Sequence, residues 1–171
     1  YSSLSSDVAD WLFDASRTEG DTTYIANDSG VYYVLYFVSR STNDDLLPNV
    51  RHILISVSDT SDETAMEEAR TKANEILAEF DAGDKTAESF GALAKEYTDD
   101  SNGDEGGLYE NITPGQMVTE FNDWCFDESR QPGDTGIVET TYGVHVMYFD
   151  SFGKTYRDTL VENALRTADY N

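Results

Sequence analysis

Cysteine and long apolar runs are both scarce in this sequence of 171 residues. Cys125 is the single cysteine, so a disulfide within the chain is excluded. One cysteine fits a protein of the reducing cytosol and equally an exported protein from a cell that uses little cysteine. The longest apolar run, residues 31–38, is far shorter than the roughly 20 residues of a membrane-spanning helix. It is typical of a buried strand.

Basic residues are also few. Eleven lysines and arginines stand against 34 acidic residues, which gives a net charge of −23. Such a chain is repelled by phosphate backbones and by anionic lipids, so binding to nucleic acid or to an acidic membrane surface is disfavoured. The ordinary consequence of this acidity is solubility.

Apolar residues are frequent enough to build a packed core. They make up 39% of the chain, and 12% of the residues are aromatic, which argues against wholesale disorder. The length fits one ordinary domain with an appendage. The sequence starts at Tyr1 without a methionine, so we expect any signal peptide or lipid anchor upstream of it.

The chain contains an internal repeat. Residues 10–36 align without a gap with residues 123–149, and 11 of the 27 positions are identical. At the place of His145 the first copy has Tyr32. We interpret the first copy as the second half of a degenerate unit. Because a helix and a hairpin are not stable alone, we predict that this fragment packs on the main domain, on a neighbouring molecule or on a first half of its own.

The sequence divides into four predicted segments. Residues 1–40 are expected to form a helix to Phe13 and a hairpin with strands at 22–26 and 31–40. The remaining segments are a polar linker at 41–49, a main domain at 50–151 and a C-terminal helix at 152–171. Within the main domain we predict a strand at 50–57, helices from a cap at 60–63 to about residue 80 and at 87–97, a short strand from 108, a short helix, and two strands meeting at 142–143. This order predicts an α+β domain with a small antiparallel sheet.

Five short motifs in the main domain occur in the order and at the spacing of one known family. They are RHILI (51–55), FGALAKEYTDD (90–100), GGL (106–108), GQMVTEF (115–121) and YGVHV (142–146). On these motifs the segment from Val50 to Phe149 resembles the parvulin-type peptidyl-prolyl cis/trans isomerases. The resemblance implies the parvulin fold, which is FKBP-like, with four antiparallel strands surrounded by helices. It implies no cofactor and no metal.

The resemblance also assigns roles to single residues. The polar residues that it places at the catalytic site are His52, Asp100, Thr140 and His145. The apolar residues that it expects to hold the proline ring of the substrate are Leu108, Met117 and Phe121. Met117 and Phe121 are four residues apart at the start of a helix, so they share one face. We expect the polar group to form a hydrogen-bond network that transfers no proton to the substrate.

Three observations qualify these roles. The loop 56–64 has no lysine or arginine, so the preference of some relatives for phosphoserine before proline is not expected. The segment 109–114 is one residue longer than the family pattern, which alters the rim of the pocket. Cys125 with His145 could form a nucleophilic pair. However, the repeat places Leu12 opposite Cys125, which indicates an apolar position.

The resemblance implies an enzyme that isomerises Xaa-Pro bonds in unfolded or partly folded chains and assists the folding of exported proteins. Two alternatives stay open. The same groove could hold peptides as a chaperone without turnover, or the N-terminal hairpin could serve as an interaction or dimerisation element. Because a degenerate copy beside a complete one resembles multidomain bacterial foldases, we expect an exported protein outside the cell or at its surface.

Overall fold

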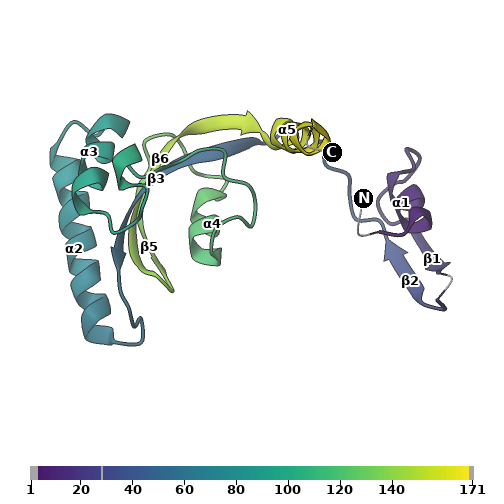
Figure 1. Ribbon diagram of the computed structural model, residues 1–171, viewed down its shortest axis with the longest axis horizontal. Coiled ribbons are helices and arrows are strands. Elements are labelled where there is room, and N and C mark those ends of the chain that lie inside the picture. The colour runs from purple at the N-terminus through teal and green to yellow at the C-terminus, as the bar shows by residue number, and fades with distance from the viewer. Residues whose placement is uncertain (1–3, 28, 170–171) are drawn as a thin grey trace. The chain divides into compact units, whose positions relative to one another are not determined.

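The computed structural model describes residues 4–27 and 29–169. The chain divides into two compact units, residues 1–42 and residues 43–171. In Figure 1 the smaller unit is purple to blue, and the larger one runs from blue to yellow. No helix among the described residues is long and apolar enough to cross a membrane.

The larger unit is built on a four-stranded antiparallel sheet with the strand order β4-β3-β6-β5. Its strands are β3 (Leu46–Ser56), β4 (Leu108–Tyr109), β5 (Thr135–Thr140) and β6 (Gly143–Thr155). Its helices are α2 (Glu63–Ala82), α3 (Ala87–Tyr97), a 3-10 turn η1 (Gly103–Glu105), α4 (Thr119–Cys125) and α5 (Tyr156–Asp169). Helices α2 and α3 lie on one face of the sheet and α4 on the other (Figure 1). The predicted α+β class and four-stranded sheet are confirmed.

Each face of the sheet has its own core, because successive strand residues point to opposite sides. On β6, Val144, Val146 and Tyr148 belong to the cluster beneath α2 and α3. Met147 and Phe149 belong to the cluster beneath α4. The same alternation puts His145 on the α4 face. All five apolar side chains are buried, which holds the strand register in place.

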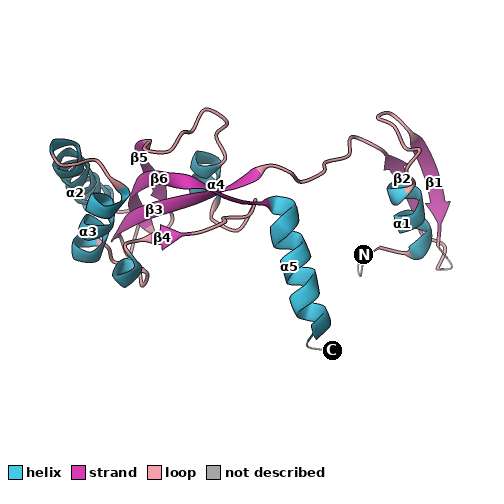
Figure 2. Cartoon of the chain, turned by 90° about the horizontal axis from the view of Figure 1, so that it is seen from above, coloured by secondary structure: helices cyan, strands magenta, loops and turns pink. Residues whose placement is uncertain are grey.

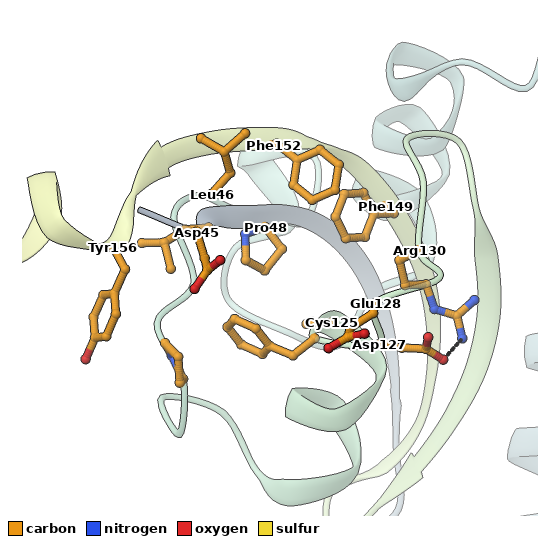
Figure 3. A pocket seen from close by; sticks show the side chains of 13 residues that line it. Asp45, Leu46, Pro48, Cys125, Asp127, Glu128, Arg130, Phe149, Phe152 and Tyr156 are labelled. Carbon is orange, nitrogen blue, oxygen red and sulfur yellow. Dashed lines mark ion pairs between the residues drawn. The ribbon is translucent and has the colours of Figure 1, made fainter. Parts of the chain in front are cut away.

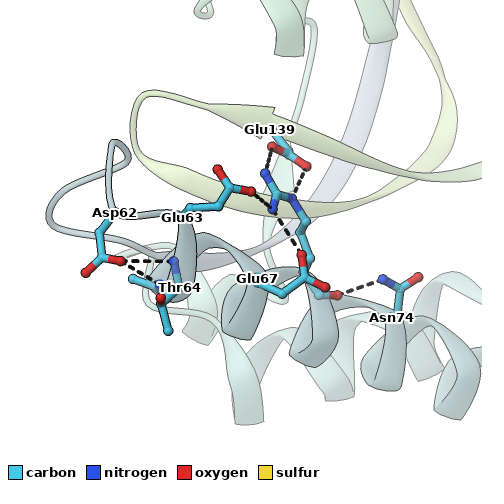
Figure 4. A network of polar contacts seen from close by, with 8 residues as sticks. Asp62, Glu63, Thr64, Glu67, Asn74 and Glu139 are labelled. Atoms are coloured by element: carbon cyan, nitrogen blue, oxygen red, sulfur yellow. Dashed lines mark hydrogen bonds and ion pairs between the residues drawn. The ribbon is translucent and has the colours of Figure 1, made fainter.

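Helix α2 is fixed at its start and along its side. The carboxylate of Asp62 accepts hydrogen bonds from the backbone amides of Thr64 and Ala65, as the predicted cap requires. Arg70 then joins α2 to β5, since its guanidinium pairs with Glu139 at 2.7 Å and also with Glu63 and Glu67 (Figure 4).

The predicted linker at 41–49 is wrong in its second half, because β3 begins at Leu46. Leu47 is fully buried, and Pro48 pairs with Phe152 at an irregularity of the ladder. Such a bulge tolerates a residue without an amide hydrogen. Strand β6 is correspondingly longer than predicted and ends at Thr155. The C-terminal helix therefore begins at Tyr156 rather than at residue 152, and Figure 2 shows it following the end of β6.

The smaller unit consists of α1 (Ser6–Phe13), β1 (Thr22–Ala26) and β2 (Tyr32–Tyr36). The two strands form an antiparallel hairpin, as predicted, but β2 ends at Tyr36 rather than at residue 40. Its packing around Trp11 recurs in the larger unit around Trp124. The guanidinium carbon of Arg17 lies 4.6 Å from the Trp11 ring centroid, and that of Arg130 lies 4.5 Å from the Trp124 ring.

The hairpins of the two units align with a shift of one residue relative to the gapless sequence alignment. Gly20 donates its amide hydrogen to the carbonyl of Phe37 at 2.9 Å, and Gly133 donates to Phe149 at 2.8 Å. Phe37 therefore corresponds to Phe149. The cross-strand partners agree, since Ala26 faces Tyr32 while Glu139 faces Val144. The first turn is thus one residue longer, and Tyr33, not Tyr32, takes the place of His145.

Candidate active site

Two buried histidines meet on the α4 face of the sheet. His52 lies on β3 opposite Met147, and His145 lies on β6 opposite Leu54. Because the strands are neighbours, the two rings stack with their centroids 5.3 Å apart, and the Nδ1 atoms are 3.0 Å from each other. The two residues are only 3% and 4% exposed.

A chain of hydrogen bonds extends from this pair in both directions. The Nε2 atom of His52 lies 2.8 Å from Oδ2 of Asp100, and the Nε2 atom of His145 lies 2.9 Å from Oγ1 of Thr140. The backbone amide of Tyr142 donates to Thr140 Oγ1 at 3.1 Å. The structure thus brings the four polar residues that the sequence singled out into one network.

Burial sets the charge of the network. Burial, and to a smaller extent the neighbouring His52, lowers the pKa of His145 to about 4. Burial also lowers the pKa of His52, although the carboxylate of Asp100 acts in the opposite direction. Both rings are therefore neutral near pH 7. Burial alone would raise the pKa of Asp100, but hydrogen bonds from Tyr109 and His52 outweigh it and hold that pKa below its ordinary value.

One arrangement of protons satisfies every member of the network. Because Asp100 is ionised, His52 donates from Nε2 and its Nδ1 must accept, since a neutral imidazole carries one N–H. His145 then donates from Nδ1, and its Nε2 accepts from the Thr140 hydroxyl. Thr140 in turn accepts from the amide of Tyr142. The network is fully paired without any buried positive charge, which is the inexpensive way to bury polar groups.

Tyr109 belongs to this site although sequence reasoning did not select it. Its hydroxyl donates to Oδ2 of Asp100 at 2.9 Å, and its ring centroid lies 5.3 Å from that of His52. Burial, followed by the hydrogen bond to Asp100, raises the pKa of Tyr109 to about 12, so the phenol stays protonated. Its signal in the sequence was the unusual segment 109–114, which it opens.

Leu108, which was expected to hold the proline ring, is not part of the cavity. It is paired with Arg51, whereas Tyr109 is paired with Val50. Cross-strand partners share a face of the sheet, and Val50 belongs to the core beneath α4. The prediction for Leu108 is therefore wrong by one residue, because the two-residue strand β4 presents Tyr109 to the site face and Leu108 to the other.

The histidine pair forms the floor of a cavity of about 300 Å³. The residues that line it are His52, Leu54, Asp100, Tyr109, Gln116, Met117, Val118, Phe121, Tyr142 and His145. Phe121 stands edge-on to both imidazole rings, with centroid distances of 5.4 and 5.6 Å. Met117 and Phe121 thus form part of the apolar wall, as expected, and Thr140 supports the floor from beneath. The result is an apolar cup over a fixed polar base.

Two neighbouring contacts hold the loop that carries Asp100 against β3. The amide of His52 donates to the carbonyl of Gly107 at 2.9 Å. A side chain at Gly107 would place its Cβ 2.2 Å from the His52 carbonyl oxygen, and the backbone there has φ +67°, so only glycine fits. Arg51 donates to the carbonyl of Gly106 at 3.1 Å while it pairs with Asp150 at 2.7 Å.

A second cavity of about 330 Å³ lies where the ends of β3 and β6 meet the C-terminal end of α4 (Figure 3). Cys125 is one of its lining residues, together with Pro48, Phe149 and Tyr156, and no histidine is among them. The thiol is buried, which raises the pKa of Cys125 to about 12. A protonated thiol in a different cavity from His145 does not form a nucleophilic pair with it.

A family model for the PPIC-type peptidyl-prolyl isomerase (PPIase) domain matches residues 32–151. The chain belongs to this family. The chain shares 32% identity over 152 residues with the chaperone SurA of Hahella chejuensis, covering 85% of this chain and 31% of the relative. It shares 34% over 99 residues with the foldase protein PrsA 1 of Listeria innocua, covering 57% and 28%. The chain thus spans about a third of the length of these curated relatives.

Solved structures agree on the fold. A crystal structure of a PpiC-type isomerase domain aligns with 67% of this chain and 98% of its own at a TM-score of 0.56 and 22% identity. PrsA from Bacillus cereus aligns with 71% of this chain and 41% of its own at a TM-score of 0.50 and 26% identity. The resemblance to parvulin-type isomerases and the fold that it implied are confirmed.

Proposed function

We propose that residues 43–171 act as a peptidyl-prolyl cis/trans isomerase on unfolded or partly folded chains and assist the folding of exported proteins. The observation that carries this proposal is the neutral histidine pair beneath an apolar cavity with an ionised carboxylate at its side. The relatives named as a chaperone and a foldase support it. We also propose, on the same relatives, that the protein is exported from a bacterium.

The reaction requires binding of a twisted amide and no bond cleavage. An Xaa-Pro bond isomerises over a barrier of ~18–20 kcal/mol because the planar amide loses its resonance when it turns. An enzyme lowers that barrier by binding the twisted form better than either planar form. The wall of Met117, Phe121 and Tyr109 would hold the proline ring while the preceding carbonyl rotates. Such a reaction needs no nucleophile.

The polar residues would act by their fixed positions. Hydrogen bonds link Thr140 to His145, His145 to His52 and His52 to Asp100. The carboxylate of Asp100 therefore cannot reorient without breaking its hydrogen bond to His52. Asp100 and Tyr109 are the groups at the end of this series that face the cavity. Preorganised groups of this kind stabilise a changed charge distribution without reorganising at the moment of reaction. We assign the histidines a positioning role.

The loop between β3 and α2 argues against a phosphorylated substrate. It carries Asp59 and Asp62 and no basic residue. A phosphate group is recognised by clustered arginines or lysines and is repelled by carboxylates. We therefore propose a substrate without phosphoserine before proline.

The test is the cis-to-trans rate of short Xaa-Pro peptides in the presence of the protein. We expect acceleration, and we expect Met117→Ala to lower kcat/KM by at least about tenfold because it opens the cup. Met66→Ala is the matched control, since Met66 is buried on the opposite face beneath α2. It should lower stability and leave the rate of the folded protein unchanged.

Three outcomes would contradict the proposal. A preference for phosphoserine before proline would refute the inference that the acidic loop between β3 and α2 disfavours a phosphorylated substrate. Equal losses from Met117→Ala and Met66→Ala would refute the position of the cup. Peptide binding without any acceleration would mean that the groove holds chains and does not isomerise them.

A further inference from the structure

The hairpin of the smaller unit exposes one uncharged face. Cross-strand pairing places Tyr24 opposite Val34 and Thr22 opposite Tyr36, and these exposed side chains alternate along the strands with the partly buried Thr23, Ile25 and Leu35. Val34 is 84% exposed and Tyr24 is 74% exposed. A contiguous aromatic and aliphatic face of this kind marks an interaction surface on a soluble protein.

The larger unit shows what covers the corresponding face. The one-residue shift established above equates Val34 with Val146 and Tyr36 with Tyr148. Val146 is fully buried and Tyr148 nearly so, in the cluster beneath α2 and α3. The face that is open in the first hairpin is therefore the face that carries two helices in the second.

The outer edge of β2 is also uncovered among the described residues. β6 pairs with β5 on one side and with β3 on the other. β2 pairs with β1, and among the described residues no strand lies along its other edge. An open edge presents unpaired backbone groups that a further strand can bond. Among its described residues, the smaller unit thus has no counterpart of β3, α2 or α3.

We infer that this face and edge are a docking surface for a segment that forms a strand and two amphipathic helices, as β3, α2 and α3 do. We assign the segment to a part of the same polypeptide outside residues 1–171. The larger unit indicates the sequence that this segment would have. Its strand would alternate apolar and polar residues, as β3 does, and would pair with the open edge of β2. Its helices would carry a face of small and aliphatic residues, such as Ala69, Ala73 and Ile76 on α2. This inference is independent of the proposed catalytic activity.

Two observations favour the same polypeptide over a second copy of this chain. Each copy carries a net charge of −23, so two copies repel each other before any contact forms. In addition, the β3, α2 and α3 of a second copy are already buried in its own larger unit. Both of these curated relatives are about three times as long as the part that matches, so each has further polypeptide beyond the match.

The first test is the reading frame that encodes Tyr1. We expect it to encode, ahead of residue 1, a strand followed by two amphipathic helices, because that half precedes the hairpin half in the complete copy. The second test compares hydrogen exchange of residues 32–36 in the 171-residue chain and in the longest polypeptide of that frame. We expect exchange to slow by at least about 100-fold in the longer one.

A pair of variants identifies the surface. Val34→Glu places a charge on the docking face and should abolish the added protection in the longer polypeptide. Ala15→Glu introduces the same residue in the exposed turn, where the complete copy already has Glu128, and should leave the protection intact. In the 171-residue chain, we expect the two variants to unfold alike.

Several results would overturn the inference. These are a reading frame without such a segment, equal exchange of residues 32–36 in both polypeptides, or protection that survives Val34→Glu. A dimer of the 171-residue chain with slow exchange in β2 would assign the surface to a second copy instead.

Discussion

In the α1–β1–β2 region and in the α4–β5–β6 region, an arginine lies over a tryptophan ring and donates from Nε to the carbonyl of that tryptophan. In both regions an aspartate accepts hydrogen bonds from a serine two residues later. Yet Val34 is largely exposed while its counterpart Val146 has no exposed surface. Local contacts are therefore sufficient to shape the helix, turn and hairpin, and burial depends on elements that are distant in the sequence.

The same difference explains why the polar site is found in one region alone. His145 belongs to a hydrogen-bond network because β3 places His52 beside it and the loop after α3 places Asp100 beside His52. Tyr33 occupies the corresponding place in the first hairpin, where β2 pairs with β1 and, among the described residues, no strand lies along its other edge. The two tryptophans, Trp11 and Trp124, sit one in each region, so fluorescence of single-tryptophan variants can report on each separately.

The turn glycines give the largest expected contrast. Alanine at Gly143 would place its Cβ 2.2 Å from the carbonyl oxygen of Ile55, with the backbone at φ +135°. Gly30 has φ +76° but no atom within 4 Å of such a Cβ. We expect Gly143→Ala to cost the larger unit about 4 kcal/mol of unfolding free energy and Gly30→Ala about 1 kcal/mol in its own unit. Urea titration followed by Trp124 and by Trp11 would measure both, and equal losses would contradict the role of β3.

Acid should weaken the larger unit and spare the smaller one. An unfolded histidine binds its proton near pH 6.5, while His145 in the folded chain binds it only near pH 4. Between these values the unfolded chain holds a proton that the folded chain lacks, so stability is complete above pH 6.5 and falls as the pH drops toward 4. The loss is on the order of 3 kcal/mol at most.

The check is the urea midpoint of each unit between pH 7 and pH 4. His145→Gln is the control and should flatten this part of the profile for the larger unit. A midpoint that rises on acidification in the same range, or a profile that His145→Gln leaves unchanged, would show that the histidine pair is not the source.

Removal of the ring nitrogens should have an intermediate effect. His145→Phe keeps a buried ring and leaves His52 and Thr140 without their partner, which we expect to cost about 2 kcal/mol. It should also lower isomerase activity by about tenfold or more. Tyr33→Phe is the matched change in the first hairpin and should alter neither quantity. Thermal unfolding and the peptide assay would measure the two effects, and full activity in His145→Phe would disprove the positioning role.

The arginines over the tryptophans should give the smallest and most even effects. Arg17→Met and Arg130→Met each remove one cation–π contact, one hydrogen bond to a carbonyl and weak surface ion pairs with aspartates, from side chains that are equally exposed. We expect each substitution to lower the unfolding free energy of its own region by about 1 kcal/mol. A red shift of the emission of the affected tryptophan would accompany the loss. A much larger effect in one region would show that the shared contacts are not equivalent.

Sequence reasoning succeeded where short motifs carry local information. It predicted α3 at residues 87–97 and a capping segment at residues 60–63, within which Asp62 is the N-cap residue. It also identified His52 and His145, because two histidines in 171 residues both fell in family motifs. It failed at Leu108, because the faces of a two-residue strand are set by which residue of β3 lies opposite each one.

The sequence alone determined helix α3, the capping segment of α2, the family and the polar residues of the network, since these follow from neighbours within a few positions and from motifs of fixed spacing. Tertiary structure decided that β3 starts at Leu46, that Tyr109 completes the cavity, and that the two hairpins differ by one residue in their turns. Each of these depends on which strand pairs with which and in what register. That choice is made by burial across the whole sheet, and no single stretch of sequence contains it.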